Sequence, residues 1–164
     1  MKIFKPLFLI YSLMIFSVAA KSDTDFSYQT LEGIKTVAVQ VEGINKDLYR
    51  YGFDPISLTK LLEHKLSTAG FKIISKEEVF HDETASLIKL KFNDIRSEYG
   101  FYSYGVDLAV KEKIPLPRRR NAFISATIWN EAAHGMMMYH EVYKLQKSVD
   151  ELLESLITEH RNQN

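Results

Sequence analysis

From residue 85 onward, apolar and polar residues alternate with a period of two, and this pattern restricts that part of the chain to β-strands. The first run places Ile88, Leu90 and Phe92 between polar residues. Similar runs extend over residues 102–110 and 123–129. Successive side chains of a strand point to opposite faces, so each run has one apolar and one polar face. We therefore expect three antiparallel strands in a meander.

The preceding segment combines strands with one helix. Residues 35–43 alternate strongly and predict a strand. Asp54 as a cap, Pro55 at the first helical position, leucines at helical spacing and a closing Gly70 predict an amphipathic helix over roughly 55–69. Residues 71–75 are typical of a short strand, which the intervening helix allows to lie parallel to the first. Residues 76–79 predict a helical turn.

The C-terminal segment is expected to end in a second helix. Asn130–Gly135 predicts a turn, and residues 136–145 follow no clear period. Ser148 and Glu151 have the spacing of a capping box, and an apolar stripe continues to about His160. The predicted fold class is α+β, with a single mixed, mostly antiparallel sheet (β-α-β, then a β-β-β meander). Both helices pack on one face of that sheet.

The first twenty residues have the three parts of a secretory signal peptide. Lys2 and Lys5 form a basic start, residues 6–18 are largely apolar, and Val18 and Ala20 supply small residues at a cleavage site. An uncleaved anchor is the alternative, but a membrane span needs roughly 20 apolar residues. We expect cleavage after Ala20, a periplasmic or secreted protein, and a single globular domain over residues 21–164.

Charge and cysteine content limit the partners of this domain. The chain has 21 basic and 21 acidic residues, and two of the basic ones lie in the predicted leader. This balance provides no overall attraction to nucleic acid or to a membrane. Because the chain contains no cysteine, it forms no disulfide and has no site for the usual bacterial lipid anchor. No segment after residue 20 is apolar enough to span a membrane.

Two segments resemble a set of small bacterial periplasmic domains. The segments are Gly33–Val39 and Leu61–Ile74, and a tryptophan-bearing strand before a terminal helix adds to the likeness. The set includes the lipopolysaccharide-assembly lipoprotein that plugs an outer-membrane barrel and the lipoproteins of the curli-secretion type. The resemblance implies a fold and assigns no functional residue. Lys21 stands where those lipoproteins require a lipidated cysteine.

The segment from His134 to His140 contains two residue types that bind copper. Thioether sulfur and imidazole are ligands for Cu(I). In an extended chain His134, Met136, Met138 and His140 would share one face. The alternative is a structural role, in which the methionines fill gaps in the core. The segment is thus a candidate metal site, and packing in the core is the alternative interpretation.

A second candidate site is basic. Lys111, Lys113, Arg118, Arg119 and Arg120 flank two prolines in what we expect to be one exposed loop. Clustered arginines bind phosphates, for example those of an anionic lipid headgroup. A solvated loop without a ligand is the alternative.

Enzyme signatures are absent from the sequence. It contains no Gly-x-Ser-x-Gly elbow, no pair of histidines spaced for zinc and no glycine-rich phosphate loop. We therefore expect a domain without catalytic activity or cofactor, which contacts an envelope protein or an anionic lipid or glycan surface. A small copper-handling protein is the alternative function.

Overall fold

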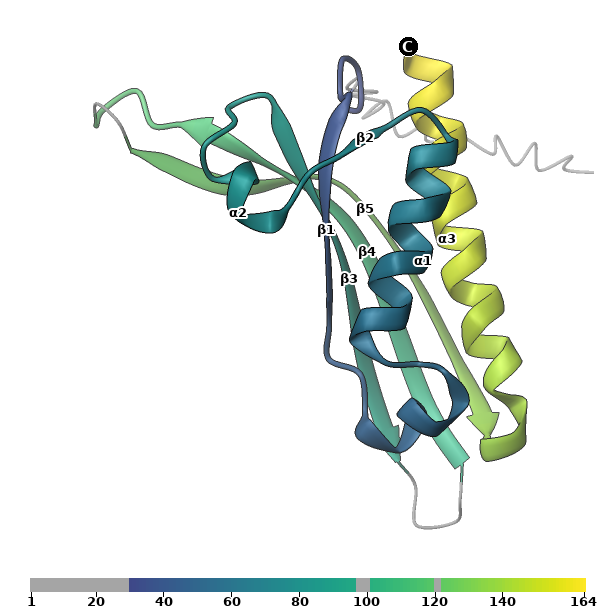
Figure 1. Ribbon diagram of the computed structural model, residues 1–164. Coiled ribbons are helices and arrows are strands. Elements are labelled where there is room, and N and C mark those ends of the chain that lie inside the picture. Colours follow the sequence, from purple (N-terminus) through teal and green to yellow (C-terminus); the bar gives the residue numbers. More distant parts are fainter. Residues whose placement is uncertain (1–29, 97–100, 120–121) are drawn as a thin grey trace, which may run out of the picture.

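A computed structural model describes residues 30–96, 101–119 and 122–164. The predicted leader lies outside these residues. The structure forms one sheet with two long helices on one side (Figure 1). In chain order the elements are β1 (Thr36–Glu42), the 3-10 helix η1 (Lys46–Tyr51), α1 (Pro55–Thr68), β2 (Lys72–Ile73), α2 (Lys76–Val79), β3 (Ala85–Arg96), β4 (Phe101–Pro115), β5 (Phe123–Met138), the 3-10 helix η2 (Tyr139–Glu141) and α3 (Val142–Gln163).

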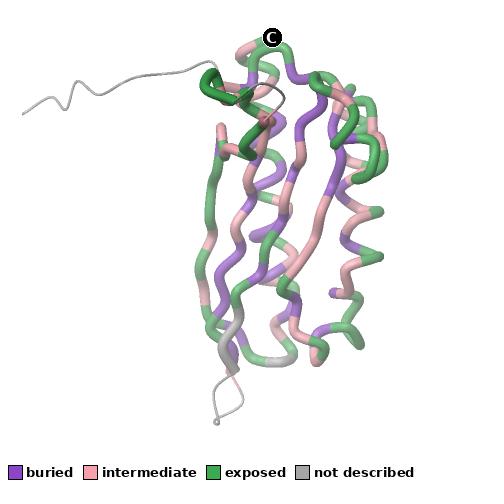
Figure 2. The backbone as a smooth tube through the Cα atoms, turned by 90° about the vertical axis from the view of Figure 1, so that its left-hand side faces the viewer, coloured by how far each residue is buried: buried purple, intermediate pink, exposed green. Residues whose placement is uncertain are grey.

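The sheet is mixed, with the strand order β2-β1-β3-β4-β5. β1 runs parallel to both β2 and β3. β3, β4 and β5 pair antiparallel in the order in which they follow in the chain. The predicted β-α-β unit, the meander and the placement of two helices on one face are therefore confirmed. Figure 2 shows buried and exposed residues alternating along these strands.

The core lies between the sheet and the helices α1 and α3. Asp54 caps α1, because its Oδ1 accepts from the backbone N–H groups of Ile56 and Ser57, each at 3.0 Å. The leucine stripe of α1 and the stripe of α3 then face alternate residues of β1, β3 and β4. None of the helices in the described residues is both long and apolar enough to cross a membrane. The most deeply buried core side chains include Leu62, Leu66, Val37, Leu90, Tyr102, Val106, Leu108, Leu153 and Leu156.

The short helix α2 packs at one end of the opposite face. A capping box begins this helical turn, because Ser75 Oγ accepts from Glu78 N and Glu78 Oε2 accepts from Ser75 N. Val79 packs there with Ala38 and Ala85 in a small separate cluster. Among the described residues, no other helix lies on this face (Figure 1).

The turn predicted over Asn130–Gly135 is wrong. β5 continues through this segment, in register with residues 104–109 of β4. Gly135 lies opposite Tyr104, and a Cβ there would stand 2.5 Å from the Tyr104 hydroxyl. The glycine therefore makes room for an aromatic ring within a strand. Cross-strand pairing overrides the local turn signal.

The helix start predicted at Ser148 is also wrong. α3 begins at Val142, and Ser148 lies inside it. The Ser148 hydroxyl donates to the carbonyl of Lys144 at 3.1 Å and lies 3.3 Å from the Tyr104 hydroxyl. Val142 and Leu145 are buried, so the apolar stripe begins earlier than the sequence pattern indicates.

The end of α3 is bonded to the segment before β1. The backbone N–H of Leu31 donates to Gln163 Oε1 at 2.8 Å, and that of Gly33 donates to Asn164 Oδ1 at 2.7 Å. The His160 ring lies 2.7 Å from the carbonyl oxygen of Ile34. We call this set of contacts the terminal clasp.

We predict that Leu62→Ala lowers the free energy of unfolding by about 2–5 kcal/mol, the usual cost of a large-to-small change in a core. Leu62 is 1% exposed. Ile56→Ala in the same helix is the matched control, because Ile56 is 70% exposed. Urea unfolding measures both. Equal losses in the two variants would contradict the described packing.

The cap of α1 predicts a pH effect. Hydrogen bonds from Ser57, and then from the backbone of Ile56, hold the pKa of Asp54 below its ordinary value of 3.8. The ionised cap thus stabilises the fold above that value, and its contribution is lost as the pH falls below it. Asp54→Asn retains a cap that does not titrate. The difference in unfolding free energy between wild type and Asp54→Asn should change between neutral pH and about pH 2, in favour of the variant at low pH. A constant difference would refute this.

Candidate anion-binding surface

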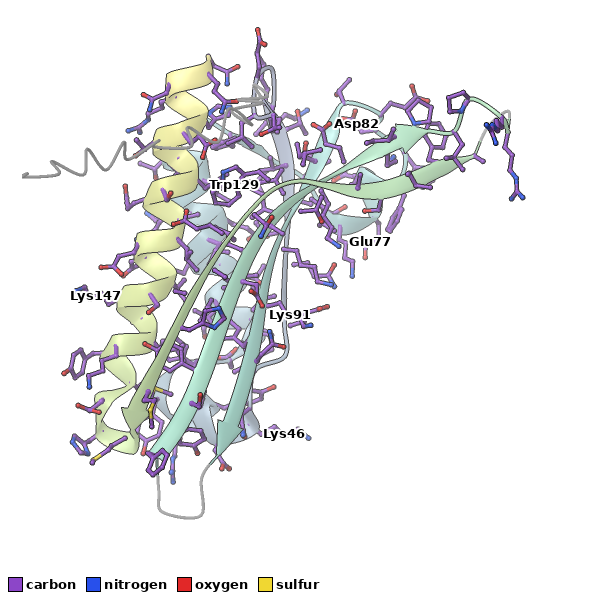
Figure 3. All side chains as sticks on the ribbon, turned by 180° about the vertical axis from the view of Figure 1, so that it is seen from behind. Lys46, Glu77, Asp82, Lys91, Trp129 and Lys147 are labelled. Carbon is purple, nitrogen blue, oxygen red and sulfur yellow. The ribbon has the colours of Figure 1, made fainter. Side chains whose placement is uncertain are left out.

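The face of the sheet opposite α1 and α3, called the open face below, is rich in lysine. Figure 3 shows this face, with Lys91 projecting from it. A hollow of about 430 Å³ on this face has Ala109 among its lining residues. The residues around it are Lys89, Lys91, Asp107, Lys111, Thr127 and Asn130.

Two acidic side chains offset part of this charge. Lys89 Nζ lies 2.6 Å from Glu42 Oε1. The hydrogen bond from Lys89, together with the nearby charges of Lys89 and Lys91, holds the pKa of Glu42 below its ordinary value, so Glu42 stays ionised. Lys91 is the cross-strand partner of Asp107. Lys111 forms no ion pair within the described part of the chain.

The predicted basic loop is partly strand. β4 extends to Pro115, so Lys111 and Lys113 lie in β4 and only Arg118 and Arg119 lie in the exposed turn that follows. The two prolines do not exclude Lys111 and Lys113 from the strand. Pro115 is the last residue of β4 and still pairs with Phe123, and Pro117 lies beyond the strand. Lys113 Nζ donates to the carbonyl of Asp82 at 3.1 Å. Arg120 lies outside the described residues.

The strands β4 and β5 continue beyond the rest of the sheet as a two-stranded projection (Figure 1). We call its described residues, 112–119 and 122–126, the arm. Its large apolar side chains are exposed: Ile114 by 40%, Phe123 by 45% and Ile124 by 46%. The sequence contains one signal of this projection. The adjacent apolar residues Phe123 and Ile124 of one strand must face opposite sides.

The residues of the candidate copper site lie at the other end of β5. His134, Met136 and Met138 are exposed and share the open face, as the alternation predicted. The His134 ring lies against Gly105 of β4. Met137 points to the core, and His140 lies in η2. The Cα atoms of His134 and Met138 are about 14 Å apart at the rise of a strand, so neighbouring pairs, rather than the whole set, are spaced to share one ion.

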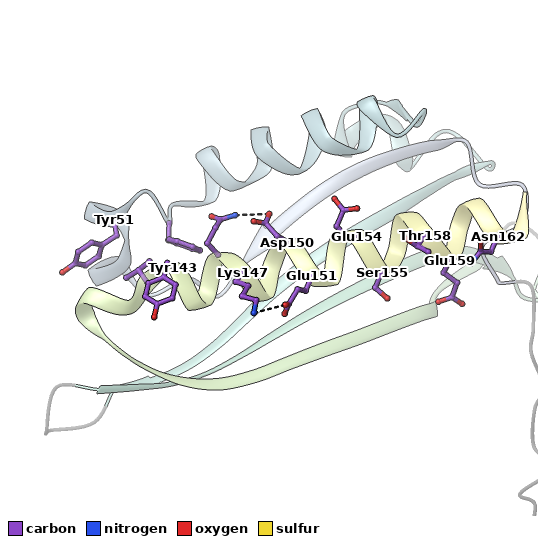
Figure 4. A pocket seen from close by; sticks show the side chains of 13 residues that line it. Tyr51, Tyr143, Lys147, Asp150, Glu151, Glu154, Ser155, Thr158, Glu159 and Asn162 are labelled. Atoms are coloured by element: carbon purple, nitrogen blue, oxygen red, sulfur yellow. Dashed lines mark hydrogen bonds and ion pairs between the residues drawn. The ribbon is translucent and has the colours of Figure 1, made fainter.

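A groove of about 1180 Å³ runs along the outer side of α3, with Tyr51 at one end (Figure 4). Three of its acidic side chains are engaged within the protein. Asp150 Oδ1 lies 2.7 Å from Lys65 Nζ, Glu151 Oε1 lies 3.5 Å from Lys147 Nζ, and Glu159 Oε2 accepts from the Trp129 indole N–H at 2.6 Å. The described residues contain no group of three or more His, Asp or Glu side chains placed to hold a metal ion. The groove therefore provides no converging set of metal ligands among these residues.

No family model and no curated protein matches the chain. Among solved structures, the 2.35 Å crystal structure of a minor lipoprotein from Acinetobacter baumannii is similar over 79% of this chain and 90% of that one. The sequence identity is 11% and the TM-score is 0.36. A TM-score this low does not establish a shared fold. The resemblance to lipopolysaccharide-assembly and curli-secretion lipoproteins stays a prediction from the sequence.

Proposed function

We propose that the protein is an exported domain of the cell envelope, without catalytic activity, that binds an anionic envelope component. The observation that carries this proposal is a series of cationic side chains that runs from the open face onto the arm. The series consists of Lys89, Lys91, Lys111, Lys113, Arg118 and Arg119.

The position of this series favours a large anionic ligand. All six cations lie on β3, on β4 or in the turn after β4. Glu42 and Asp107 offset the part of the series nearest β1 and the middle of the sheet, and Asp82 and Glu83 lie near Lys113 at the arm. A cation held near an anionic membrane surface contributes about 1 kcal/mol to binding. Several such contributions together support reversible binding to phosphates of a lipid or a glycan.

The envelope part of the proposal depends on the leader predicted over residues 1–20. Export through a secretory signal would bring the domain to a compartment where phosphorylated lipids and glycans are abundant and nucleic acid is not a usual partner. The chain lacks cysteine, so it reaches such a surface without a lipidated cysteine. Reversible electrostatic binding fits a domain of this kind.

We predict that residues 21–164 sediment with vesicles containing anionic phospholipid and not with purely zwitterionic vesicles. The variant Lys111→Ser, Arg118→Ser, Arg119→Ser should bind anionic vesicles at least tenfold more weakly, at roughly 1 kcal/mol for each charge removed. The matched control Lys46→Ser, Lys60→Ser, Lys147→Ser removes the same charge away from the open face and the arm, and should bind like wild type.

Salt provides a second measurement of the same binding. Binding to anionic vesicles should weaken steeply as salt rises, because ions screen charges at an exposed surface. Equal binding to both kinds of vesicle, or equal losses in the two triple variants, would contradict the proposed function.

Copper handling is a second candidate function, and the exposed face shared by His134, Met136 and Met138 favours it. Cu(I) should raise the melting temperature of the wild-type protein, and Met136→Leu, Met138→Leu should abolish the increase. Met137→Leu is the matched control, because Met137 lies next to both residues but is buried. A Cu(I) titration with no binding tighter than micromolar, or an equal loss in the control, would refute this function.

A further inference from the structure

The arm departs from the rest of the sheet at a defined point. The last pair between β3 and β4 is Leu87 with Lys111, whereas β4 and β5 stay paired as far as Pro115 and Phe123. Beyond Lys111 the ribbon therefore has neither a third strand nor a long covering helix among the described residues (Figure 1). Its outer part extends past the body, where a flat surface can reach it.

The arm is held in shape at both of its ends. At the base, the Ser86 hydroxyl donates to Glu112 Oε1 at 3.1 Å, and Lys113 Nζ donates to the carbonyl of Asp82 at 3.1 Å. Near the tip, the backbone N–H of Leu116 donates to the carbonyl of Ala122 at 2.9 Å. These bonds fix where its side chains point, which reduces the entropy lost on binding.

Exposed apolar side chains gather on the outer part of the arm. Ile114 and Ile124 are cross-strand partners and so share one face of the ribbon. Phe123 is on the other face, opposite Pro115. Nearer the body, the exposed β5 residues Ser125 and Thr127 are polar. Exposed apolar patches of this kind mark sites of contact with a protein or a membrane.

The cationic side chains around these apolar residues favour a membrane, rather than a protein, as the partner. A hollow of about 510 Å³ brings Lys113 and Arg119 beside Phe123 and Leu116, with Glu83 as its acidic member. Arg118 is exposed in the same turn. Apolar side chains next to cations match an anionic bilayer, where phosphates lie immediately above the acyl chains.

We propose that the arm is a membrane-attachment element. Ile114, Phe123 and Ile124 insert at the boundary between headgroups and acyl chains of an anionic bilayer, while Arg118 and Arg119 bind lipid phosphates. This inference rests on the proposed function and deepens it by naming a lipid bilayer as the anionic component. It also separates two contributions: the cations attract the protein to the surface, and the apolar side chains hold it there.

The absence of cysteine allows a direct test, because one introduced thiol can be labelled alone. Ile124→Cys, labelled with a fluorophore that responds to polarity, should shift to shorter wavelength with anionic lipid vesicles and be quenched by lipids brominated in the acyl chains. Ser103→Cys, exposed at the opposite end of β4, should show neither change. The variant Ile114→Ser, Phe123→Ser, Ile124→Ser should lose at least tenfold in vesicle binding and keep wild-type thermal stability, since all three side chains are exposed.

The outcomes distinguish membrane attachment by the arm from the proposed function on which it rests. If the labelled protein binds anionic vesicles while the Ile124→Cys label stays in water, the arm does not insert, and the proposed function stands. If the wild-type protein does not bind anionic vesicles, the proposed function falls and the inference falls with it. If the emission of the label shifts without vesicles as the protein dimerises, a second copy of the chain covers the arm and the inference is overturned. If the emission shifts only with envelope fragments that contain protein, the partner is a protein and the inference is likewise overturned.

Discussion

β4 and β5 are longer than the layer of helices that covers them, and this mismatch determines which surfaces the protein exposes. At about 3.4 Å per residue, the 15 residues of β4 span about 50 Å, whereas the 22 residues of α3 span about 33 Å at 1.5 Å per residue. The helices therefore bury only part of the ribbon that β4 and β5 form. Burial of apolar surface stabilises that part, and the remainder is left for contacts with other molecules.

An irregular register marks the place where the covered part of the ribbon ends. Val110 pairs with Trp129, but the next residue, Lys111, pairs with Thr127, so Ile128 has no direct partner in β4. A bulge of this kind bends a strand and increases its twist. Trp129, beside the bulge, is fixed by the hydrogen bond from its indole N–H to Glu159 of α3. The bulge thus lies next to a side chain that is bonded to α3.

The sequence predicts an element where its local signals agree with its long-range contacts. Asp54, the leucine stripe and Gly70 define α1 without reference to the rest of the chain, and the structure agrees. The segment around Gly135 predicts a turn that does not form. Its glycine is required because the ring of Tyr104, on another strand, occupies the space that a side chain would fill. Likewise, the cations of the candidate site were visible in the sequence as a cluster, but their continuity with the lysines of β3 depends on strand register. The adjacent residues Phe123 and Ile124 show that one apolar side chain faces away from the core, but the exposure of both is a property of the assembled sheet.

The terminal clasp has a consequence for how the chain folds. It joins residues separated by 126 to 132 positions, so a long loop must close before its bonds form. The segment ahead of β1 is synthesised long before His160 to Asn164, and until these residues are made it lacks its partners at that end of the molecule. The clasp therefore forms late, after the strands and helices between its two halves have been made.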